Sequence, residues 1–185
     1  MCRTGWISGE ILKLGGEAMI PCLLRLLDIT MNNNAIRDDW KKAIVVPTYK
    51  WRDRLVVGNY RPISLISVVC KQMKHVITRY LRQVWEMSGW FYEGRYVFTP
   101  GHSCEGQLVT VCQDIMDPLD EGVKTNAIII DFSKAFYLVP HDRPLTKIVA
   151  TGVDLRVVVW VQEFLLGRSQ RVNVDGQLSE EVRVT

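Results

Sequence analysis

The feature that most constrains the fold is a run of three isoleucines that ends on an acid. Ile128, Ile129 and Ile130 are followed directly by Asp131. A short, continuous run of β-branched residues is typical of a strand that is buried on both faces, because neither side of it suits water. We therefore predict a buried strand over residues 126–132, with the Asp131 carboxylate near its end.

The Asp131 carboxylate has two possible roles. An acid at the carboxyl end of a buried strand can reach the sheet edge, where a divalent cation and phosphate oxygens would meet it. Alternatively, Asp131 or Ser133 only caps a turn that begins at Lys134. For an isolated pattern of this kind the cap is the more common explanation. Evidence from other segments is therefore needed to choose between the two roles of Asp131.

Basic residues gather in one part of the chain. Residues 41–82 hold ten Lys or Arg, and Asp53 is the single acid among them. This segment therefore carries +9 and the remainder −6, for a net charge of +3. A basic block on an otherwise acidic chain indicates phosphate ligands, either nucleic acid or nucleotide. A solvated helix face beside a basic loop would give the same count.

Length and composition favour one ordinary domain. The 185 residues, 48% of them hydrophobic, are enough for a single core. Apolar runs fall short of the roughly 20 residues that cross a bilayer, and no signal peptide is evident. We expect an intracellular protein, nuclear or cytoplasmic and not secreted, with no membrane partner. The five cysteines form no C-x-x-C pair, so a zinc site is not predicted, and Cys70 and Cys112 are expected to be buried.

The pattern of apolar residues predicts a mixture of helices and strands. We expect helices over residues 7–31 (broken at Gly15-Gly16), 67–87, 104–116, 145–150 and 154–166. Strands are expected over residues 43–48, 60–66, 126–132, 170–174 and 181–184, the last two joined as a hairpin by Asp175-Gly176. Pro47 indicates an edge position for the first strand. Because helices and strands do not alternate regularly, the predicted fold class is α+β.

The longest expected helix, residues 67–87, is amphipathic. Ser67 is a suitable N-cap for it. At three- and four-residue spacing the apolar side chains fall on one face. The predicted buried face consists of Val69, Met73, Val76, Ile77, Tyr80 and Val84.

Five segments, in order, resemble the reverse transcriptases of LINE-type (non-LTR, jockey-like) retrotransposons. D-F-S-K-A-F-Y-L-V-P-H at 131–141 resembles motif A, and N-Y-R-P-I-S-L at 59–65 resembles the first fingers motif. W-K-K-A-I-V-V-P-T-Y-K at 40–50 precedes that motif. F-T-P-G-H-S-C-E-G-Q-L at 98–108 is similar to the primer/template-contacting segment. G-R-S-Q-R-V-N-V-D-G from 167, with the following S-E-E-V-R-V-T, resembles the run leading into motif B.

This resemblance covers nearly the whole chain and implies a partial right-hand polymerase. Residues 41–105 would form the fingers and residues 106–185 the beginning of a palm whose sheet is incomplete. Residues 1–40 would be a helical segment against the fingers. The implied activity is that of an RNA-directed DNA polymerase, a nucleotidyltransferase that uses an RNA template, a DNA primer and deoxynucleoside triphosphates. The oligomeric state is not indicated.

The resemblance also implies roles for single residues at the reaction centre. Asp131 would be a palm carboxylate that holds divalent ions, Mg²⁺ or Mn²⁺, with the backbone carbonyl of Phe132 as a neighbouring ligand. Lys50 and Arg61 would bind the incoming triphosphate from the fingers, and Phe136 would lie beneath the sugar and disfavour a 2′-hydroxyl. Otherwise Arg61 braces the fingers and Phe136 belongs to the core.

A further set of residues is expected to contact nucleic acid. Its members carry positive charge or polar groups on segments that match the family's fingers and primer/template regions. They are Arg52, Arg54, His102, Ser103, Arg168 and Arg171.

The sequence departs from the family pattern at several positions. Trp51 follows the fingers lysine where glycine is usual, and Val97 also replaces a glycine. His102 takes the place of an arginine, and Tyr137 replaces a second acid that is not the proposed metal ligand.

No A-D-D motif or Asp-Asp pair follows Asp131, so this chain carries one of the usual palm carboxylates. We therefore expect it to be inactive alone and to bind metal weakly or not at all. The alternative is a non-catalytic nucleic-acid-binding or relic protein derived from a mobile element.

Overall fold

The structure is a computed structural model that describes residues 7–184 apart from 93, 98, 100 and 133–137. Phe136 and Tyr137 therefore lie outside the described residues. The chain divides into two compact units, and each is described by itself. The first combines Met1–Val84 with Pro140–Thr185, and the second is Trp85–Val139.

The first unit begins with the interrupted helix that the sequence predicts. α1 (Gly9–Gly15) is capped by Ser8, whose Oγ accepts a hydrogen bond from the Ile11 N–H at 3.3 Å. The short 3-10 turn η1 (Gly16–Met19) then leads into α2 (Ile20–Asn32). Gly16 has a φ of 49°, a left-handed value that glycine adopts without the steric penalty of a β-carbon. This confirms the predicted break.

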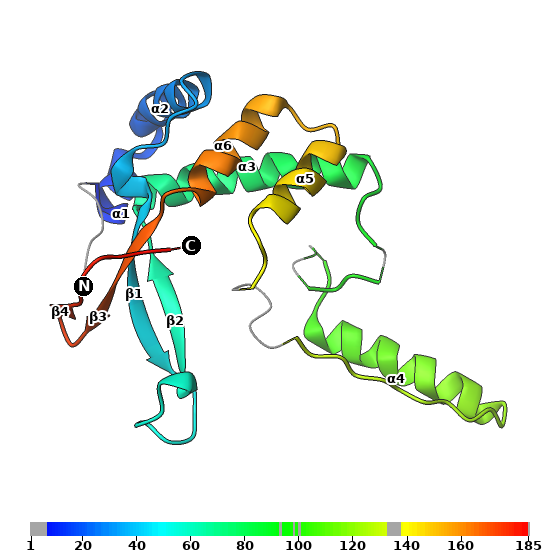
Figure 1. Ribbon diagram of the computed structural model, residues 1–185. Helices are drawn as coiled ribbons and strands as arrows, with labels where there is room; N and C mark the ends of the chain where they lie inside the picture. The colour runs from blue at the N-terminus through cyan, green and yellow to red at the C-terminus, as the bar shows by residue number, and fades with distance from the viewer. Residues whose placement is uncertain (1–6, 93, 98, 100, 133–137, 185) are drawn as a thin grey trace. The chain divides into compact units, whose positions relative to one another are not determined.

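A five-stranded mixed sheet forms the framework of the first unit (Figure 1). Its strands are β1 (Lys42–Tyr49), β2 (Tyr60–Leu65), β3 (Ser169–Val174), β4 (Gln177–Leu178) and β5 (Val182–Arg183). β1 pairs antiparallel with β2 on one side and parallel with β3 on the other. The far edge of β3 is shared by β4 and β5, both antiparallel to it. The mixed helix and sheet content agrees with the predicted α+β class.

The predicted edge position of the first strand is wrong, because β1 lies between β2 and β3. Pro47 is tolerated there for two reasons. The parallel pairing with β3 extends only to Val45, so no carbonyl group of β3 requires a hydrogen bond from the backbone nitrogen of residue 47. On the other side Pro47 faces Pro62, and the hydrogen bond from the Lys50 N–H to the Asn59 carbonyl sets the alternation of the ladder. By that alternation the two prolines form a non-hydrogen-bonded pair, which requires no N–H donor between the strands.

The C-terminal hairpin differs in detail from its prediction. Asp175 and Gly176 both have positive φ, 51° and 88°, as a two-residue hairpin turn requires. This turn joins β3 to the short β4, and β5 pairs with the other end of β3 after a bend. The expected strand over residues 181–184 is reduced to two residues, because β3 offers β5 only Ser169 and Gln170 as partners.

The long amphipathic helix is confirmed as α3 (Val68–Met87), directly after Ser67. Its buried residues are Val69, Cys70, Met73, Ile77 and Leu81. Val76 and Tyr80, which the spacing places on the buried face, are 50% and 38% exposed. The buried face of α3 is therefore rotated by part of a turn from the predicted one, and Cys70 and Leu81 are buried in place of Val76 and Tyr80. The predicted burial of Cys70 is confirmed, and this burial raises the pKa of the thiol to about 11.

Two further helices complete the first unit. α5 (Asp142–Ala150) contributes Ile148 to the core, and α6 (Leu155–Leu165) contributes Val157, Val158 and Trp160. The remaining buried apolar side chains come from the segment around the 3-10 turn η2 (Asp38–Trp40), from β1 and from the turn between α5 and α6; they are Ile36, Trp40, Ala43, Val45 and Val153.

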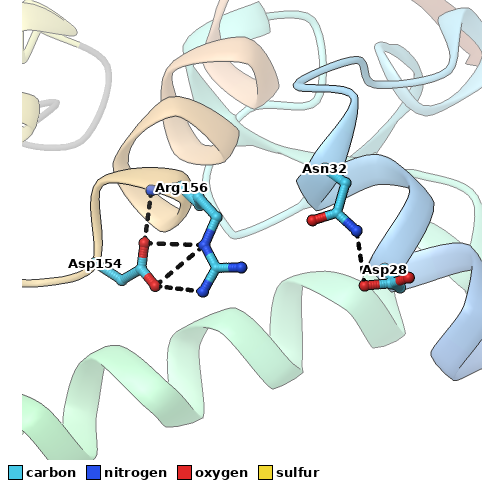
Figure 2. Close-up of polar contacts among 4 residues, drawn as sticks. All are labelled: Asp28, Asn32, Asp154 and Arg156. Atoms are coloured by element: carbon cyan, nitrogen blue, oxygen red, sulfur yellow. Dashed lines mark hydrogen bonds and ion pairs between the residues drawn. The ribbon is translucent and has the colours of Figure 1, made fainter.

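Electrostatic contacts fix the start of α6. Asp154 caps the helix by accepting from the Arg156 N–H at 2.9 Å, and its carboxylate also binds the Arg156 guanidinium at 2.7 Å. Figure 2 shows this pair together with the bond that Asn32 donates to Asp28 on α2. The Arg156 guanidinium lowers the pKa of the Asp154 carboxyl, and Asp154 and Asp28 both raise the pKa of Arg156.

The second unit has one helix, α4 (Cys104–Asp120), among its described residues. The predicted buried strand over residues 126–132 is wrong. The described residues from 123 to 132 have no regular secondary structure, and Ile128, Ile129 and Ile130 are 85%, 92% and 72% exposed. The predicted burial of Cys112 is also wrong.

Both errors have one physical cause. No described residue between 85 and 139 is buried, so the second unit offers no core for these side chains. An extended segment without a neighbouring strand leaves its backbone N–H and C=O groups to water and gains no stability from a strand ladder. A correct apolar pattern therefore yields a strand only where a partner is present.

Candidate nucleotide and nucleic-acid interface

The β1–β2 hairpin brings Lys50 and Arg61 together. Thr48 is opposite Arg61 in the register, and the Lys50 N–H donates to the Asn59 carbonyl at 2.9 Å. Side chains alternate along a strand, so Lys50, Thr48 and Arg61 lie on the same face of the hairpin. Lys50 and Arg61 are diagonal neighbours on that face, a relation in which long side chains can reach each other. Both side chains are exposed.

The loop between the two strands is held in one conformation by its own polar groups. The Tyr60 hydroxyl donates to the Arg54 carbonyl at 2.9 Å, and the Tyr49 hydroxyl donates to the Arg52 carbonyl. The Asn59 amide donates to the Asp53 carbonyl at 2.7 Å. These bonds bind the middle of the loop to the ends of β1 and β2, so its cations are presented from a defined backbone.

Aromatic rings support two of these cations. The Tyr49 and Tyr60 rings lie 5.6 Å apart, and the Arg54 guanidinium lies 5.0 Å from the centre of the Tyr49 ring. The Arg52 guanidinium lies 5.1 Å from the centre of the Trp51 ring. Trp51, one of the residues that depart from the family pattern, is 65% exposed. Lys50, Arg52, Arg54 and Arg61 thus form a basic hairpin tip with a net charge of +3 against Asp53.

Arg168 and Arg171 have different surroundings, although the sequence gives them the same role. Arg168 is half-buried: its guanidinium lies 4.5 Å from the Phe164 ring centre and donates to the Phe164 carbonyl at 3.0 Å. Burial lowers the pKa of Arg168. Arg171, on β3, is exposed and donates to the Glu181 carboxylate at 3.3 Å. Arg168 therefore has contacts that brace α6, whereas Arg171 faces solvent.

His102 and Ser103 lie in the second unit, at the start of α4. The Ser103 hydroxyl caps this helix by accepting from the Gly106 N–H at 3.0 Å. The His102 ring lies 4.7 Å from the Tyr96 ring. The Ser103 hydroxyl is thus occupied in the helix cap. Nearby Val97 does not have a positive φ, so the backbone here accepts a residue other than glycine at that position.

Asp131 and Phe132 also belong to the second unit. Both are exposed, Phe132 to 76%, and neither lies in a helix or strand. Arg61 lies in the first unit, so an arrangement of Asp131 opposite the basic hairpin tip stays a prediction.

The described residues do not fit a divalent metal centre. Within them, no group of three or more His, Cys, Asp or Glu side chains is arranged to hold a metal ion. Hard cations such as Mg²⁺ require several oxygen ligands at short distances, and one exposed carboxylate does not supply them. The described part of this chain therefore does not form the two-metal centre that the family resemblance implies.

Comparison with known proteins decides the family. Residues 41–185 match the family described as reverse transcriptase (RNA-dependent DNA polymerase), and these residues include the whole sheet and α3 to α6. The chain belongs to the reverse transcriptase family. The resemblance seen in the sequence is confirmed, and the family is one of nucleotidyltransferases.

Two curated relatives of this reverse transcriptase chain come from Drosophila melanogaster. The probable RNA-directed DNA polymerase from transposon BS is 28% identical over 110 residues, which are 59% of this chain. The probable RNA-directed DNA polymerase from transposon X-element is 27% identical over 146 residues, which are 78% of this chain. The matched stretches span 12% and 16% of those relatives. In the part of the chain that the structure describes, no helix has the length and apolar character needed to cross a membrane.

The ring contacts of the basic hairpin tip were not predicted from the sequence. Neither were the hydrogen-bond and ion-pair partners of Glu181. Tyr49 and Tyr60 stand at the two ends of the loop. Once the hairpin is known, this spacing indicates that the two residues face each other across the strands. Glu181 lies in the S-E-E-V-R-V-T segment that resembles the run leading into motif B, but this resemblance gives it no partner. Its partners Lys42 and Arg171 lie 139 and 10 residues before it, so only the sheet register brings them together.

Proposed function

We propose that this chain forms the fingers and the beginning of the palm of an RNA-directed DNA polymerase from a non-LTR retrotransposon. The observation that carries this proposal is the pairing of Lys50 and Arg61 on one face of a hairpin with a fixed loop. A planar guanidinium and an ammonium group side by side suit the oxygens of a triphosphate. The proposed fingers are residues 41–105 and the proposed palm is residues 106–185; β3 to β5, from the palm part of the chain, belong to the same sheet as β1 and β2. Residues 1–40 are a helical segment beside them.

We propose that the cations of the basic hairpin tip bind different ligands. Lys50 and Arg61, on one face, bind the deoxynucleoside triphosphate. Arg52 and Arg54, in the loop, contact the backbone of the RNA template or DNA primer, with Arg171 as a further contact on the sheet. His102, Ser103 and Arg168 remain proposed contacts on the family resemblance alone. Phe136, outside the described residues, keeps its proposed place beneath the sugar.

Ultraviolet crosslinking of radiolabelled dTTP tests the triphosphate site. Charge-assisted contacts contribute about 1.5–3 kcal/mol each, so Arg61→Ala should weaken dTTP binding by roughly tenfold or more. Lys50→Ala should weaken it in the same direction. Arg79→Ala, an exposed arginine on α3, is the matched control and should leave crosslinking unchanged. Equal loss in all three variants would contradict a specific site at the hairpin tip.

Asp131 and the Phe132 carbonyl are proposed as the catalytic position from motif A alone. Because one exposed carboxylate cannot hold two divalent cations, we propose that the 185-residue chain does not incorporate nucleotides by itself. Primer extension with Mg²⁺ or Mn²⁺ should give no product from the chain or from Asp131→Ala. Product that depends on Asp131 would contradict this part of the proposal.

A second candidate is a nucleic-acid-binding protein without catalytic activity. It is favoured by one observation: the described residues hold a basic hairpin with a hydrogen-bonded loop but no metal-ligand group. Filter binding of an RNA/DNA hybrid should then weaken steeply as salt rises, because phosphate contacts release counterions. Salt-dependent binding without incorporation supports this candidate, whereas incorporation supports the polymerase.

A further inference from the structure

The carboxylate of Glu181 is surrounded by three donors from two neighbouring strands. Its Oε1 accepts a hydrogen bond from the Ser169 hydroxyl at 2.6 Å and lies 3.9 Å from the Lys42 ammonium. Its Oε2 accepts from the Arg171 guanidinium at 3.3 Å. Both carboxylate oxygens are therefore engaged, each from a different direction. We call Lys42, Ser169 and Arg171 the sheet donor cluster.

The sheet register explains why these donors converge. Lys42 pairs with Ser169, and Ser169 pairs with Arg183, so the three residues form one row across β1, β3 and β5. Arg171 is two residues beyond Ser169 and therefore shares its face. Ala43 and Val45 on β1 are buried on the opposite face, which leaves the donor cluster on the exposed side. The position of these strands can be followed in Figure 1.

A hollow of about 420 Å³ opens at the same row. It is lined by Lys42, Ser169, Glu181 and Arg183, together with Gly167, Asp38 and Lys41, which is bound to Glu163 at 3.2 Å. The space beside the Glu181 carboxylate is thus open to solvent and bordered by three cations and by the carboxylate of Asp38.

The chemistry of this cluster is that of an anion site. An ammonium, a guanidinium and a hydroxyl around one carboxylate are the donors that phosphate oxygens also accept. The side chains of Lys42, Arg171 and Glu181 are 60%, 46% and 34% exposed, so solvent screens both ion pairs and each holds the carboxylate only weakly. A carboxylate held this weakly can be exchanged for a stronger anion. The hydrogen bond from Ser169 lowers the pKa of Glu181, so the carboxylate stays charged at neutral pH.

We propose that the sheet donor cluster is a binding site for a backbone phosphate of single-stranded RNA, and that Glu181 occupies it when RNA is absent. Glu181 thus acts as an internal competitor that weakens RNA binding on this face of the sheet. The inference rests on the proposed function, since it assumes that the chain binds nucleic acid. It adds Lys42, Ser169 and Glu181 to the interface and gives one of them an inhibitory role.

Fluorescence anisotropy with a labelled 20-nucleotide RNA tests the site on the full 185-residue chain. Glu181→Gln retains a side chain of the same shape but removes the competing charge. It should tighten RNA binding at least threefold and steepen the slope of log K against log salt by about 0.7, the release expected for one added contact to a single strand. Adding Lys42→Gln to this variant should cancel the gain, because Lys42 then no longer binds the phosphate.

Glu180→Gln is the matched control, since it makes the same change of charge at the adjacent, exposed residue. Circular dichroism melting of each variant shows whether β5 and the sheet remain folded. A folded Glu181→Gln chain that binds RNA no tighter than Glu180→Gln would overturn the site but leave the proposed function intact. Absence of RNA binding by every variant would overturn both. Tighter binding of dTTP but not of RNA would also overturn the assignment to backbone phosphate.

Discussion

Two valines on α3 provide a direct test of how this helix packs. Val69 and Val76 are seven residues apart, so they point within about 20° of each other on an ideal helix. Sequence spacing therefore places them on the same face. In the structure Val69 is 4% exposed, whereas Val76 is 50% exposed. The same chemical change, Val→Ala, should thus have unequal consequences at two positions that the sequence pattern treats as equivalent.

The magnitude follows from the buried area and helix propensity. Replacing a fully buried valine with alanine removes two carbon groups worth about 0.8 kcal/mol each, and the cavity left behind brings the loss to about 2 kcal/mol. At Val76 about half of the side chain is already in water, so the loss is about 1 kcal/mol or less. Alanine recovers about 0.5 kcal/mol of helix propensity at both positions. We expect Val69→Ala to be less stable than Val76→Ala by about 1–1.5 kcal/mol.

Urea denaturation monitored by tryptophan fluorescence measures this difference. Trp40 and Trp160 are each 2% exposed in the first unit, so unfolding changes their surroundings. The free energy of unfolding should fall clearly for Val69→Ala and little for Val76→Ala, with similar slopes against urea. Equal losses at both positions would show that Val76 is also buried, and that the register of α3 inferred here is incorrect.

Other expectations concern single groups. Because burial raises the pKa of the Cys70 thiol to about 11, Cys70 should resist iodoacetamide near neutral pH until the chain unfolds, while exposed Cys22 reacts at once, as mass spectrometry of the labelled peptides would show. The pKa of Asp154 is lowered in the folded chain, so its stabilising contribution is complete above its usual pKa and is lost as pH falls through the lowered value. Thermal melts of Asp154→Asn should therefore differ from the parent at pH 7 and converge with it in strong acid. Ser103→Ala should lower the helical circular dichroism signal of α4 by fraying its first turn, at a cost of about 1 kcal/mol.

The elements that the sequence predicts well are those fixed by local interactions. α3 begins directly after Ser67, and the break between α1 and α2 falls at Gly15-Gly16, because caps and glycine conformations depend on neighbouring residues. The β1–β2 hairpin is also predictable, since its strands are close in sequence. The same holds for the placement of Lys50 and Arg61 on the basic hairpin.

Features that depend on distant partners were not predictable in this way. The parallel pairing of Lys42 with Ser169 joins residues 127 positions apart, and no local pattern specifies it. This pairing makes β1 central despite Pro47 and creates the sheet donor cluster around Glu181. Conversely, the three isoleucines before Asp131 have the correct pattern for a strand but find no partner in the described part of their own unit. The spacing of apolar residues shows which side chains of a segment could be buried. It does not show whether another part of the chain packs against them.

The parallel contact between β1 and β3 has a consequence for how the chain becomes structured during synthesis. β1 leaves the ribosome long before β3, and until then one of its edges is open to other strands. The intervening residues 85–139 behave as an insertion whose ends are joined by the first unit. Loop-closure entropy rises only slowly with length, by about 0.6 kcal/mol for each doubling. A change in the length of this insertion therefore costs the first unit little folding free energy, whereas a change at the β1–β3 seam alters its whole sheet.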